Sequence, residues 1–322
     1  MSFKFYLFLI AAFILLALVA VSSGGASISL GDIVKFFTFS EIDETKQLIL
    51  LQMRLPRLVL GILIGALLAT SGVVVQSVFL NPLADPYIIG IASAATFGAV
   101  IAYLLGLSDV FYGIFAFLAA SGLSLVIFKL AAHTRSISTL LIVGIAVSSF
   151  LGAFTSFAVY LIGEDSFRIT AWMMGYLGGA NWQKIALLLP PLLFCMAYFY
   201  AKRHELNIIL NGDEEAKSLG LNVEKSKKSL LIVSSLIIGF SVAFTGMIGF
   251  VGLIIPHTLR MALHTASNAV LIPASALTGG VFLVFCDVIA KNALSPVEIP
   301  IGVVTSFFGA PFFLYLAFRK HA

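Results

Sequence analysis

The sequence predicts an all-α integral membrane protein with about ten transmembrane helices, several of them short or broken. The chain has 322 residues, of which 60% are hydrophobic and 11% charged, and its mean hydropathy is +1.09. This composition excludes the soluble globular and disordered classes. Long apolar runs recur along the whole chain, and prolines interrupt several of them. We therefore expect a single transmembrane domain over residues 1–322.

Most of the apolar runs are long enough to cross a hydrocarbon core about 30 Å thick. In chain order they are Phe5–Val21, Leu58–Leu80, Tyr87–Leu107, Val110–Ala131, Thr139–Ile162, Ile185–Ala201, Ser229–Ile255, Met261–Leu283 and Ile301–Phe318. Pro256 and Pro273 are expected to divide the region Ile232–Val288 into uneven pieces. The first run resembles a cleavable signal peptide, but its length favours an uncleaved helix.

The stretch from Arg54 to Pro86 has arginines at one end and a polar, proline-rich segment at the other. It begins Arg-Leu-Pro-Arg, continues as a Gly-rich apolar span, and ends Asn-Pro-Leu-Ala-Asp-Pro. A central arginine costs about 2.5–3.5 kcal/mol on insertion scales, so the arginines mark a rim that faces water. The prolines break the other end, and broken backbone at membrane depth is tolerated only against protein or a water-filled path. This stretch predicts a passage rather than a simple anchor.

A faint internal repeat predicts inverted-repeat-like halves. The spacing Gly65-x₃-Ala69-x-Ser71-Gly72 recurs as Gly239-x₃-Ala243-x-Thr245-Gly246, and a proline follows ten residues after each final glycine. If an odd number of crossings separates the copies, they run in opposite directions, as in many transporters. The same small residues would also permit close helix packing without a repeat.

The most polar segment of the chain is Asn211–Asn222, within an expected cytoplasmic loop at about 205–228. Gly212 and Gly220 are expected to begin and end a short helix, whose acidic first turn suits the helix dipole. Two leucines give this helix an apolar edge. The segment is either a solvated linker or an amphipathic helix that a cytoplasmic partner binds.

The distribution of basic residues predicts the orientation in the inner membrane. With a cytoplasmic N-terminus, eleven Lys and Arg residues lie inside and seven outside, and both termini are cytoplasmic. The net charge of +4 then reflects basic loops rather than nucleic-acid binding. Cys195 and Cys286 lie in separate apolar runs, and we expect two buried thiols rather than a disulfide or metal pair.

Few side chains are candidates for chemistry. Asp287 is an acid inside an apolar run, which makes it a functional candidate, although an ion pair with Lys291 one turn later is the structural alternative. Glu298 is expected to join that pair or to mark a helix terminus. His257, beside a proline, is expected to cap or pack rather than to ligate a metal. We predict no catalytic residue, no metal site and no cofactor.

Several motifs in register resemble, over nearly the full chain, the permease subunits of ABC importers for ferric siderophores, haem and cobalamin. The matching stretches are Arg54-Leu-Pro-Arg57, Gln76, Asn81-Pro-Leu-Ala-Asp-Pro86 with Gly90, Trp172-Met-Met-Gly175 leading to Trp182, Gly212-x₃-Ala216-x₂-Leu219-Gly220, Gly246-x₂-Gly249-Phe-Val-Gly252-Leu-Ile-Ile-Pro256-His257, Glu298-Ile-Pro300-Ile-Gly302 and Gly309-Ala-Pro311-Phe-Phe. Any one of these motifs is weak, whereas the set is specific.

The resemblance implies a ten-helix subunit that pairs with a second permease subunit, identical or not, around a central pathway. It implies a periplasmic or lipoprotein substrate-binding protein outside and two ATPase subunits on the cytoplasmic loop. The positions that match the family's docking cations are Arg54, Arg57 and Lys291. The last is Lys where the cobalamin permease has Arg, so bidentate carboxylate pairing is lost there and the contact is looser.

The resemblance also implies a gate and a coupling segment. The positions that match the cytoplasmic gate are Asn81, Leu83, Ser136, Ile137, Ser138 and Thr139. Those that match the ATPase-coupling segment are Gly212, Glu214, Glu215, Ala216, Ser218, Leu219 and Gly220. No Gly-Lys pair occurs in the chain, so a P-loop is excluded and the ATPase must be a separate chain or domain.

The predicted function is therefore that of a non-enzymatic permease subunit in a binding-protein-dependent ABC importer. An iron complex, either a ferric siderophore or haem, is the favoured cargo because such cargoes are frequent in the family. A cobalamin permease is the alternative, since the stretch Trp172–Trp182 resembles that permease. An ion-coupled secondary transporter would need several paired acids within its spans, and only Asp287 qualifies. A receptor or scaffold would not need broken helices.

Overall fold

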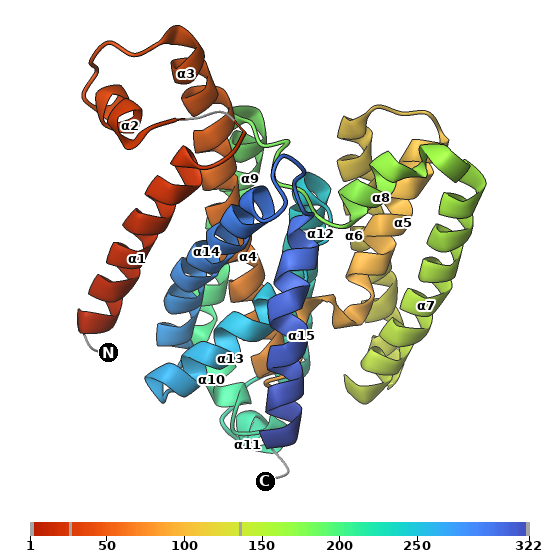
Figure 1. Ribbon diagram of the computed structural model, residues 1–322. Coiled ribbons are helices and arrows are strands. Elements are labelled where there is room, and N and C mark those ends of the chain that lie inside the picture. The colour runs from red at the N-terminus through yellow and green to blue at the C-terminus, as the bar shows by residue number, and fades with distance from the viewer. Residues whose placement is uncertain (1–2, 26–27, 135–136, 320–322) are drawn as a thin grey trace.

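The computed structural model describes residues 3–25, 28–134 and 137–319, and over these residues the chain is helical without a β-strand (Figure 1). The first half contains α1 (Phe3–Ser22), α2 (Leu30–Phe37), α3 (Glu44–Ile49), a π-helical turn η1 (Leu50–Arg54), α4 (Leu55–Val78), the 3₁₀ turn η2 (Pro86–Ile89), α5 (Ile91–Leu104), α6 (Asp109–Thr134) and α7 (Ile137–Ile162). The second half contains the 3₁₀ turn η3 (Gly163–Ser166), α8 (Phe167–Met173), α9 (Trp182–Ala201), α10 (Arg203–Ile209), α11 (Asp213–Ser218), α12 (Val223–Thr245), α13 (Val251–Leu263), α14 (Asn268–Asn292) and α15 (Ile301–Arg319).

The number and length of the apolar helices confirm the predicted fold class. Five helical stretches are long and apolar enough to cross a membrane: Glu44–Val78, Ile142–Met173, Trp182–Ala201, Val223–Thr245 and Asn268–Asn292. Five shorter apolar helices accompany them: Leu9–Ser22, Ile91–Leu104, Phe111–Ile127, Val251–Leu263 and Ile301–Leu316. The chain is an all-α membrane protein with short and broken helices. In Figure 1, α1 begins and α15 ends at the same, lower end of the molecule.

Helix α4 is the most deeply packed of these helices. It contacts α14, α12, α13 and α9, and nearly all of its last two-thirds is buried. Glycines allow this closeness. A Cβ atom on Gly65 would overlap the carbonyl group of Gly279 in α14, and one on Gly72 would overlap that of Gly252 in α13. The main chains therefore meet directly, as small residues permit between membrane helices.

The predicted repeat falls on α4 and α12. Figure 1 shows α4 descending from α3 and α12 rising from α11, so the two copies run in opposite directions. The glycine that ends the second copy, Gly246, also makes a close contact, since a Cβ there would overlap the carbonyl oxygen of Trp172. The close-packing interpretation of these small residues is therefore confirmed.

The helix breaks in the second half lie elsewhere than predicted. Pro256 and Pro273, which we expected to divide the region, lie inside α13 and α14. Two breaks occur instead: one between Gly246 and Phe250, which both have a positive φ of 68°, and one between α13 and α14, beginning at His264 with a φ of 47°. Proline is tolerated inside membrane helices because neighbouring helices and local adjustments satisfy the freed backbone groups. The left-handed backbone at Gly246 and Phe250 ends α12 and begins α13.

Helices α5, α6 and α7 form a group to one side of the bundle (Figure 1). α5 packs against α6 and α7, and α12 joins this group to α4. The span Ile142–Met173, which includes most of α7, has only 17% of its most apolar window buried within the chain. Residues such as Phe150 and Tyr160 expose apolar surface that a single copy leaves uncovered.

Candidate functional site

The segment that follows α4 is a folded polar turn, which we call the gate turn (residues 80–86). Its first residue, Leu80, has a φ of 51°, which reverses the chain direction. The side chain of Asn81 then accepts a hydrogen bond of 3.0 Å from the backbone N–H of Leu83. At the other end, Asp85 Oδ1 accepts one of 2.7 Å from the N–H of Tyr87 and caps η2. The predicted break at this point is confirmed.

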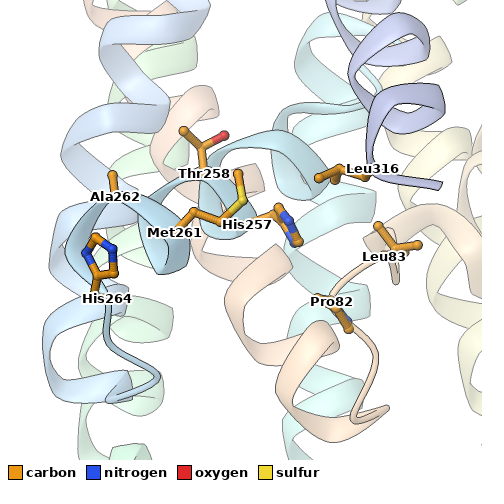
Figure 2. Close-up of a pocket in the computed structure, with 8 residues that line it drawn as sticks. All are labelled: Pro82, Leu83, His257, Thr258, Met261, Ala262, His264 and Leu316. Atoms are coloured by element: carbon orange, nitrogen blue, oxygen red, sulfur yellow. The ribbon is translucent and has the colours of Figure 1, made fainter. Parts of the chain in front are cut away.

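A cavity of about 740 Å³ adjoins the gate turn (Figure 2). Its lining residues are Pro82 and Leu83 from the turn, His257, Thr258, Met261, Ala262 and His264 from α13 and its end, and Leu316 from α15. Within it, the ring of His257 packs edge-on against Phe312, with 5.9 Å between the ring centroids. This contact agrees with the packing role predicted for His257.

Gln76, near the end of α4 and four residues before the gate turn, binds α13. Its amide nitrogen donates to the carbonyl oxygens of Gly252 and Leu253 at 3.2 and 3.3 Å, and Arg260 donates to its amide oxygen. Gln76 thereby ties α4 to α13. Of the other predicted gate residues, Ser136 lies outside the described residues, and Ile137, Ser138 and Thr139 begin α7.

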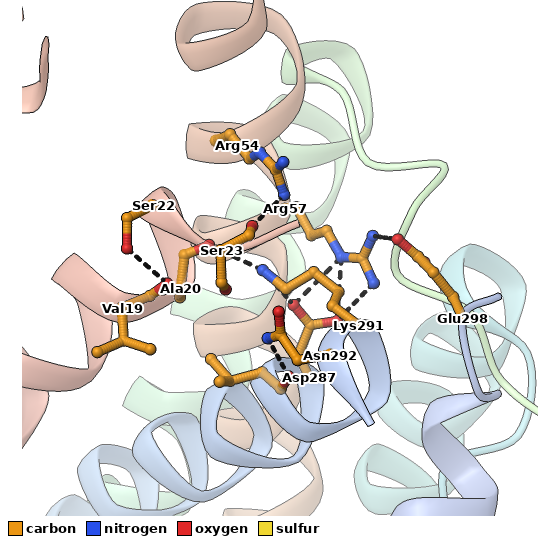
Figure 3. Close-up of polar contacts among 11 residues, drawn as sticks. Val19, Ala20, Ser22, Ser23, Arg54, Arg57, Asp287, Lys291, Asn292 and Glu298 are labelled. Carbon is orange, nitrogen blue, oxygen red and sulfur yellow. Dashed lines mark hydrogen bonds and ion pairs between the residues drawn. The ribbon is translucent and has the colours of Figure 1, made fainter. Parts of the chain in front are cut away.

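At the opposite end of α4, five charged residues form what we call the rim cluster (Figure 3): Arg54, Arg57, Asp287, Lys291 and Glu298. Arg57 is its centre. Its Nε lies 3.0 and 3.1 Å from the two oxygens of Asp287, its Nη2 lies 2.9 Å from Asp287 Oδ1, and its Nη1 lies 3.0 Å from Glu298 Oε1. Arg57 thus binds two carboxylates that follow it by more than two hundred positions.

Lys291 and Arg54 connect the rim cluster to α1. Lys291 Nζ lies 3.4 Å from Asp287 Oδ2 and donates a 2.8 Å hydrogen bond to the carbonyl of Ala20. Arg54 donates to the carbonyl of Ser23. The ion pair between Asp287 and Lys291, predicted from their spacing, is confirmed.

Burial differs sharply within the rim cluster. The side chains of Lys291, Asp287 and Arg57 are 2, 5 and 11% exposed, whereas that of Glu298 is 33% exposed. Three cations face two carboxylates, which leaves one positive charge in excess. Among the described residues Arg54 has no carboxylate partner. The structure therefore brings the three predicted docking cations together, and places two of them in internal ion pairs.

The predicted short helix of the polar loop is α11, with Gly212 before it and Gly220 after it, both at positive φ. Its sides differ. Ala216 is fully buried against the protein, whereas Glu214, Glu215, Ser218 and Leu219 are exposed. The exposed residues form the surface that a partner could contact. The buried side chain of Ala216 packs α11 against the rest of the protein.

Ion pairs fix α11 and α10 to the base of α12. Lys227 of α12, only 6% exposed, pairs with Asp213 in the first turn of α11. Glu205 of α10 binds both Lys202 and Ser226. Partial burial would raise the pKa of Glu205, but these two hydrogen bonds outweigh it and hold that pKa below its ordinary value. The loop is thus a folded unit rather than a linker.

A buried chain of amides links this unit to the end of α4. Asn207 Oδ1, on α10, accepts hydrogen bonds from the N–H and the amide nitrogen of Asn268 at 2.8 and 2.9 Å. Ser77 Oγ lies 3.2 Å from the Asn268 amide oxygen. Three helices, α10, α14 and α4, therefore meet at Asn268, which is fully buried.

Sequence reasoning missed several of these contacts. Lys227 belongs by sequence to the basic loop, and local spacing does not show that it is buried and pairs with Asp213, fourteen positions earlier in α11. Asn268 and Arg260 carried no motif at all. The hydrogen bonds that involve them join positions far apart in the chain, and local spacing gives no sign of such partners.

The model of the FecCD transport family matches residues 10–319. The cobalamin import system permease protein of Halobacterium salinarum is 43% identical over 280 residues, which cover 85% of this chain and 74% of that protein. The hemin transport system permease protein of Yersinia pestis is 35% identical over 327 residues, which cover 97% and 95%.

Solved structures share the fold. An inward-facing structure assigned to the metal-chelate type of ABC transporter superposes with a TM-score of 0.87 at 32% identity, covering 98% of this chain and 99% of that one. A structure of PsaBC from Streptococcus pneumoniae in complex with Fab has a TM-score of 0.59 at 18% identity, covering 88% and 94%, and supports the fold alone.

Proposed function

We infer the function of this chain from its family: it belongs to the FecCD transport family, and it is therefore a multi-pass membrane permease subunit of an ABC importer for a metal chelate, haem or cobalamin. Within this class we propose that the cargo is an iron complex, either a ferric siderophore or haem. The relative from Yersinia pestis, a hemin transport permease that matches almost the whole chain, supports this cargo. Cobalamin is the second candidate, because the relative from Halobacterium salinarum is a cobalamin permease at 43% identity.

The observation that carries the transport proposal is the pair of features at the two ends of α4. The rim cluster lies at its first turn, and the gate turn follows its last residue. A cation-rich rim suits the docking of a substrate-binding protein through acidic side chains, and an irregular turn beside a cavity suits a pathway that opens and closes. We propose that the substrate-binding protein docks on Arg54, Arg57 and Lys291. We propose that the gate turn and the start of α7 form the cytoplasmic gate of the pathway.

Two further sets of partners complete the proposed assembly. A second permease subunit covers the exposed apolar face of α7, so that the pathway lies between the two copies. Two ATPase subunits bind α11 from the cytoplasm, where both termini also lie. ATP binding moves α11 and thereby biases the inward-open and outward-open packings of the helices. The permease itself binds and guides cargo without chemistry.

The cargo is tested by uptake into vesicles that hold the permease with its ATPase and binding protein. Radiolabelled ferric siderophore, haem and cobalamin are offered separately, with and without ATP. ATP-dependent uptake of an iron complex, not competed by cobalamin, is the expected result. Uptake of cobalamin alone would establish the second candidate, and uptake driven by an ion gradient without ATP would reject the importer.

A further inference from the structure

Helix α2 is a short amphipathic helix that the transport function does not use. It begins seven residues after α1 ends, and a capping box fixes its first turn: Ser29 Oγ accepts from the N–H of Asp32, and the carboxylate of Asp32 accepts from the N–H of Ser29. Asp32 is held in turn by Lys46 of α3, at 2.8 Å. Since both its cap and its ion pair are formed, α2 is a defined element and not a frayed loop.

The two apolar sides of α2 have different surroundings. Ile33 is 3% exposed and packs in a small core with Val21, Ile28 and Leu50. In contrast, Leu30, Val34 and Phe37 are 61, 61 and 62% exposed. At 3.6 residues per turn these three side chains lie within an arc of about 60° on the helix. Three large apolar side chains on one exposed face need a partner to cover them.

The position of α2 identifies that partner. α1 has 20 residues and is therefore about 30 Å long, which matches the thickness of a hydrocarbon core. Its exposed side chains, among them Ile14, Leu15 and Leu18, form a surface that faces lipid in a membrane protein. The core that holds α2 includes Val21, one residue before α1 ends, so α2 lies at the level where the hydrocarbon core gives way to headgroups.

The surroundings of α2 extend the same surface. Figure 1 shows α2 beside the upper end of α1, on the outer flank of the molecule and away from α7. A hollow of about 590 Å³ between α2 and α3 has Phe36, Phe37 and Phe39 among its lining residues. The polar residues Asp32 and Lys35 lie on the other side of the helix, as an interfacial helix requires.

We propose that α2 lies in the membrane–water boundary, with Leu30, Val34 and Phe37 inserted among the lipids of the leaflet at the end of α1 distal to the N-terminus. The helix thereby fixes the height and tilt of α1 and of the rim cluster, which donates hydrogen bonds to the carbonyl of Ala20 in α1 and to that of Ser23 just after it. This inference requires only that the chain is a membrane protein, and it is independent of the cargo.

Site-directed fluorescence with lipid quenchers tests the insertion. Val34→Cys and Lys35→Cys, neighbours on the apolar and the polar face of α2, carry an environment-sensitive fluorophore in the full chain. The two native cysteines are 5 and 0% exposed, so the unsubstituted chain measures background labelling. The labelled proteins are placed in vesicles of phosphatidylethanolamine and phosphatidylglycerol. The acyl chains of these lipids are brominated near the headgroup. Leu30→Cys serves as a second reporter on the inserted face.

We expect bromolipids to quench the label at Val34→Cys and at Leu30→Cys at least twice as strongly as the label at Lys35→Cys. Equal quenching at all three positions, or none, would overturn the insertion. Shielding of the Val34 label by added binding protein, without bromolipid quenching, would show a protein-docking face and would also overturn it.

Discussion

Asp287 is the residue on which the rim cluster depends. It accepts from Arg57 on α4 and pairs with Lys291 on its own helix, and its side chain is 5% exposed. A buried ion pair adds little net stability over apolar packing, because both charges lose their hydration. Removal of one partner is different, since it leaves an uncompensated charge in the interior. Glu298 binds the same arginine from a partly exposed position, so the two carboxylates differ in burial and in the hydration that they keep.

We predict that Asp287→Asn lowers the free energy of unfolding by about 3–5 kcal/mol, because Arg57 and Lys291 lose the charge they share. Glu298→Gln, the matched control on the same guanidinium, should cost less, because this carboxylate is 33% exposed and keeps part of its hydration. Unfolding by SDS titration of the purified permease measures both. Equal losses in the two variants would show that burial does not distinguish these carboxylates.

Asp32 makes the cap of α2 sensitive to acid. The hydrogen bond from Lys46, followed by those from the backbone and side chain of Ser29, lowers the pKa of Asp32 to about 2. Because the pKa is lower in the folded helix, the stabilisation is complete above the unfolded value of roughly 4 and is lost as the pH falls through about 2. A nitroxide at Lys35→Cys should therefore stay immobile down to about pH 3 and become mobile below it. With Asp32→Asn added, its mobility should no longer change with pH.

At the scale of elements, an ion pair between the buried Lys227 and the partly exposed Asp213 joins α11 to the bundle. Lys227 and Asp213 connect the first turn of α11 to the first turns of α12, and α12 packs along α4 and α6. Lys217 and Glu214 form a second pair on α11, but their side chains are 53 and 91% exposed. An exposed pair within one helix contributes little, whereas a pair between two helices with one buried partner fixes their relative position.

We predict that Lys227→Ala lowers the cargo imported per ATP hydrolysed by about fivefold or more, a factor within the usual range of coupling free energies. The charge exchange of Lys227→Asp with Asp213→Lys should restore part of the loss, because it re-forms the pair. Lys217→Ala is the control and should import normally. Vesicle uptake and ATP hydrolysis, measured on the same preparation, give the ratio. Normal coupling in Lys227→Ala would remove the ion pair from the mechanism.

At the scale of the whole molecule, the two ends have different chemistry. In Figure 1, α11 lies beside the end of α15, and α1 begins toward the same, lower side of the molecule. The rim cluster lies around the first turn of α4, at the other end of that helix from the gate turn. The basic loop Lys202–Lys228 belongs to the end with α11, which predicts that it is cytoplasmic. The apolar face of α7 lies along the side of the molecule, and a second copy would bury it.

Reporter fusions test this orientation. Fusions at Asp109, at the start of α6, and at Arg168, in α8, should give an external signal, and a fusion at Lys217 should give a cytoplasmic one. The expectation follows from the positive-inside rule. Alkaline phosphatase and fluorescent-protein reporters at each site provide opposite readouts. A cytoplasmic signal at Asp109 together with an external one at Lys217 would reverse the orientation.

The sequence predicted what depends on local pattern. Apolar runs located the membrane helices, and two glycines located α11 to within one residue of its start and two of its end. It failed where tertiary contacts decide. Pro256 looked like a helix end but is accommodated within α13. The helix α2 was not predicted, although Ser29 and Asp32 have the spacing of a capping box and apolar residues follow at helical intervals.

The sequence predicted which cations belong to the candidate site. It did not predict which carboxylates these cations bind. Arg54, Arg57 and Lys291 were expected on an exposed rim as cations for a partner. The structure adds the acid that Arg57 binds 230 positions away, and no local spacing reports such a pair. The family resemblance predicted which positions serve docking, gating and coupling. The internal ion pairs follow only from how α4, α14 and α1 pack.

The glycine contacts of α4 make it a stiff rod through the centre of the molecule. Where Gly65 and Gly72 meet the main chains of α14 and α13, no side chain lies between the backbones that could change rotamer and absorb a displacement. The 24 residues of α4 span about 36 Å, with Arg57 in the first turn and the gate turn directly after the last. In the function that we propose, a tilt imposed at the rim cluster by docking would therefore reach the gate turn as a lateral shift of the other end of α4.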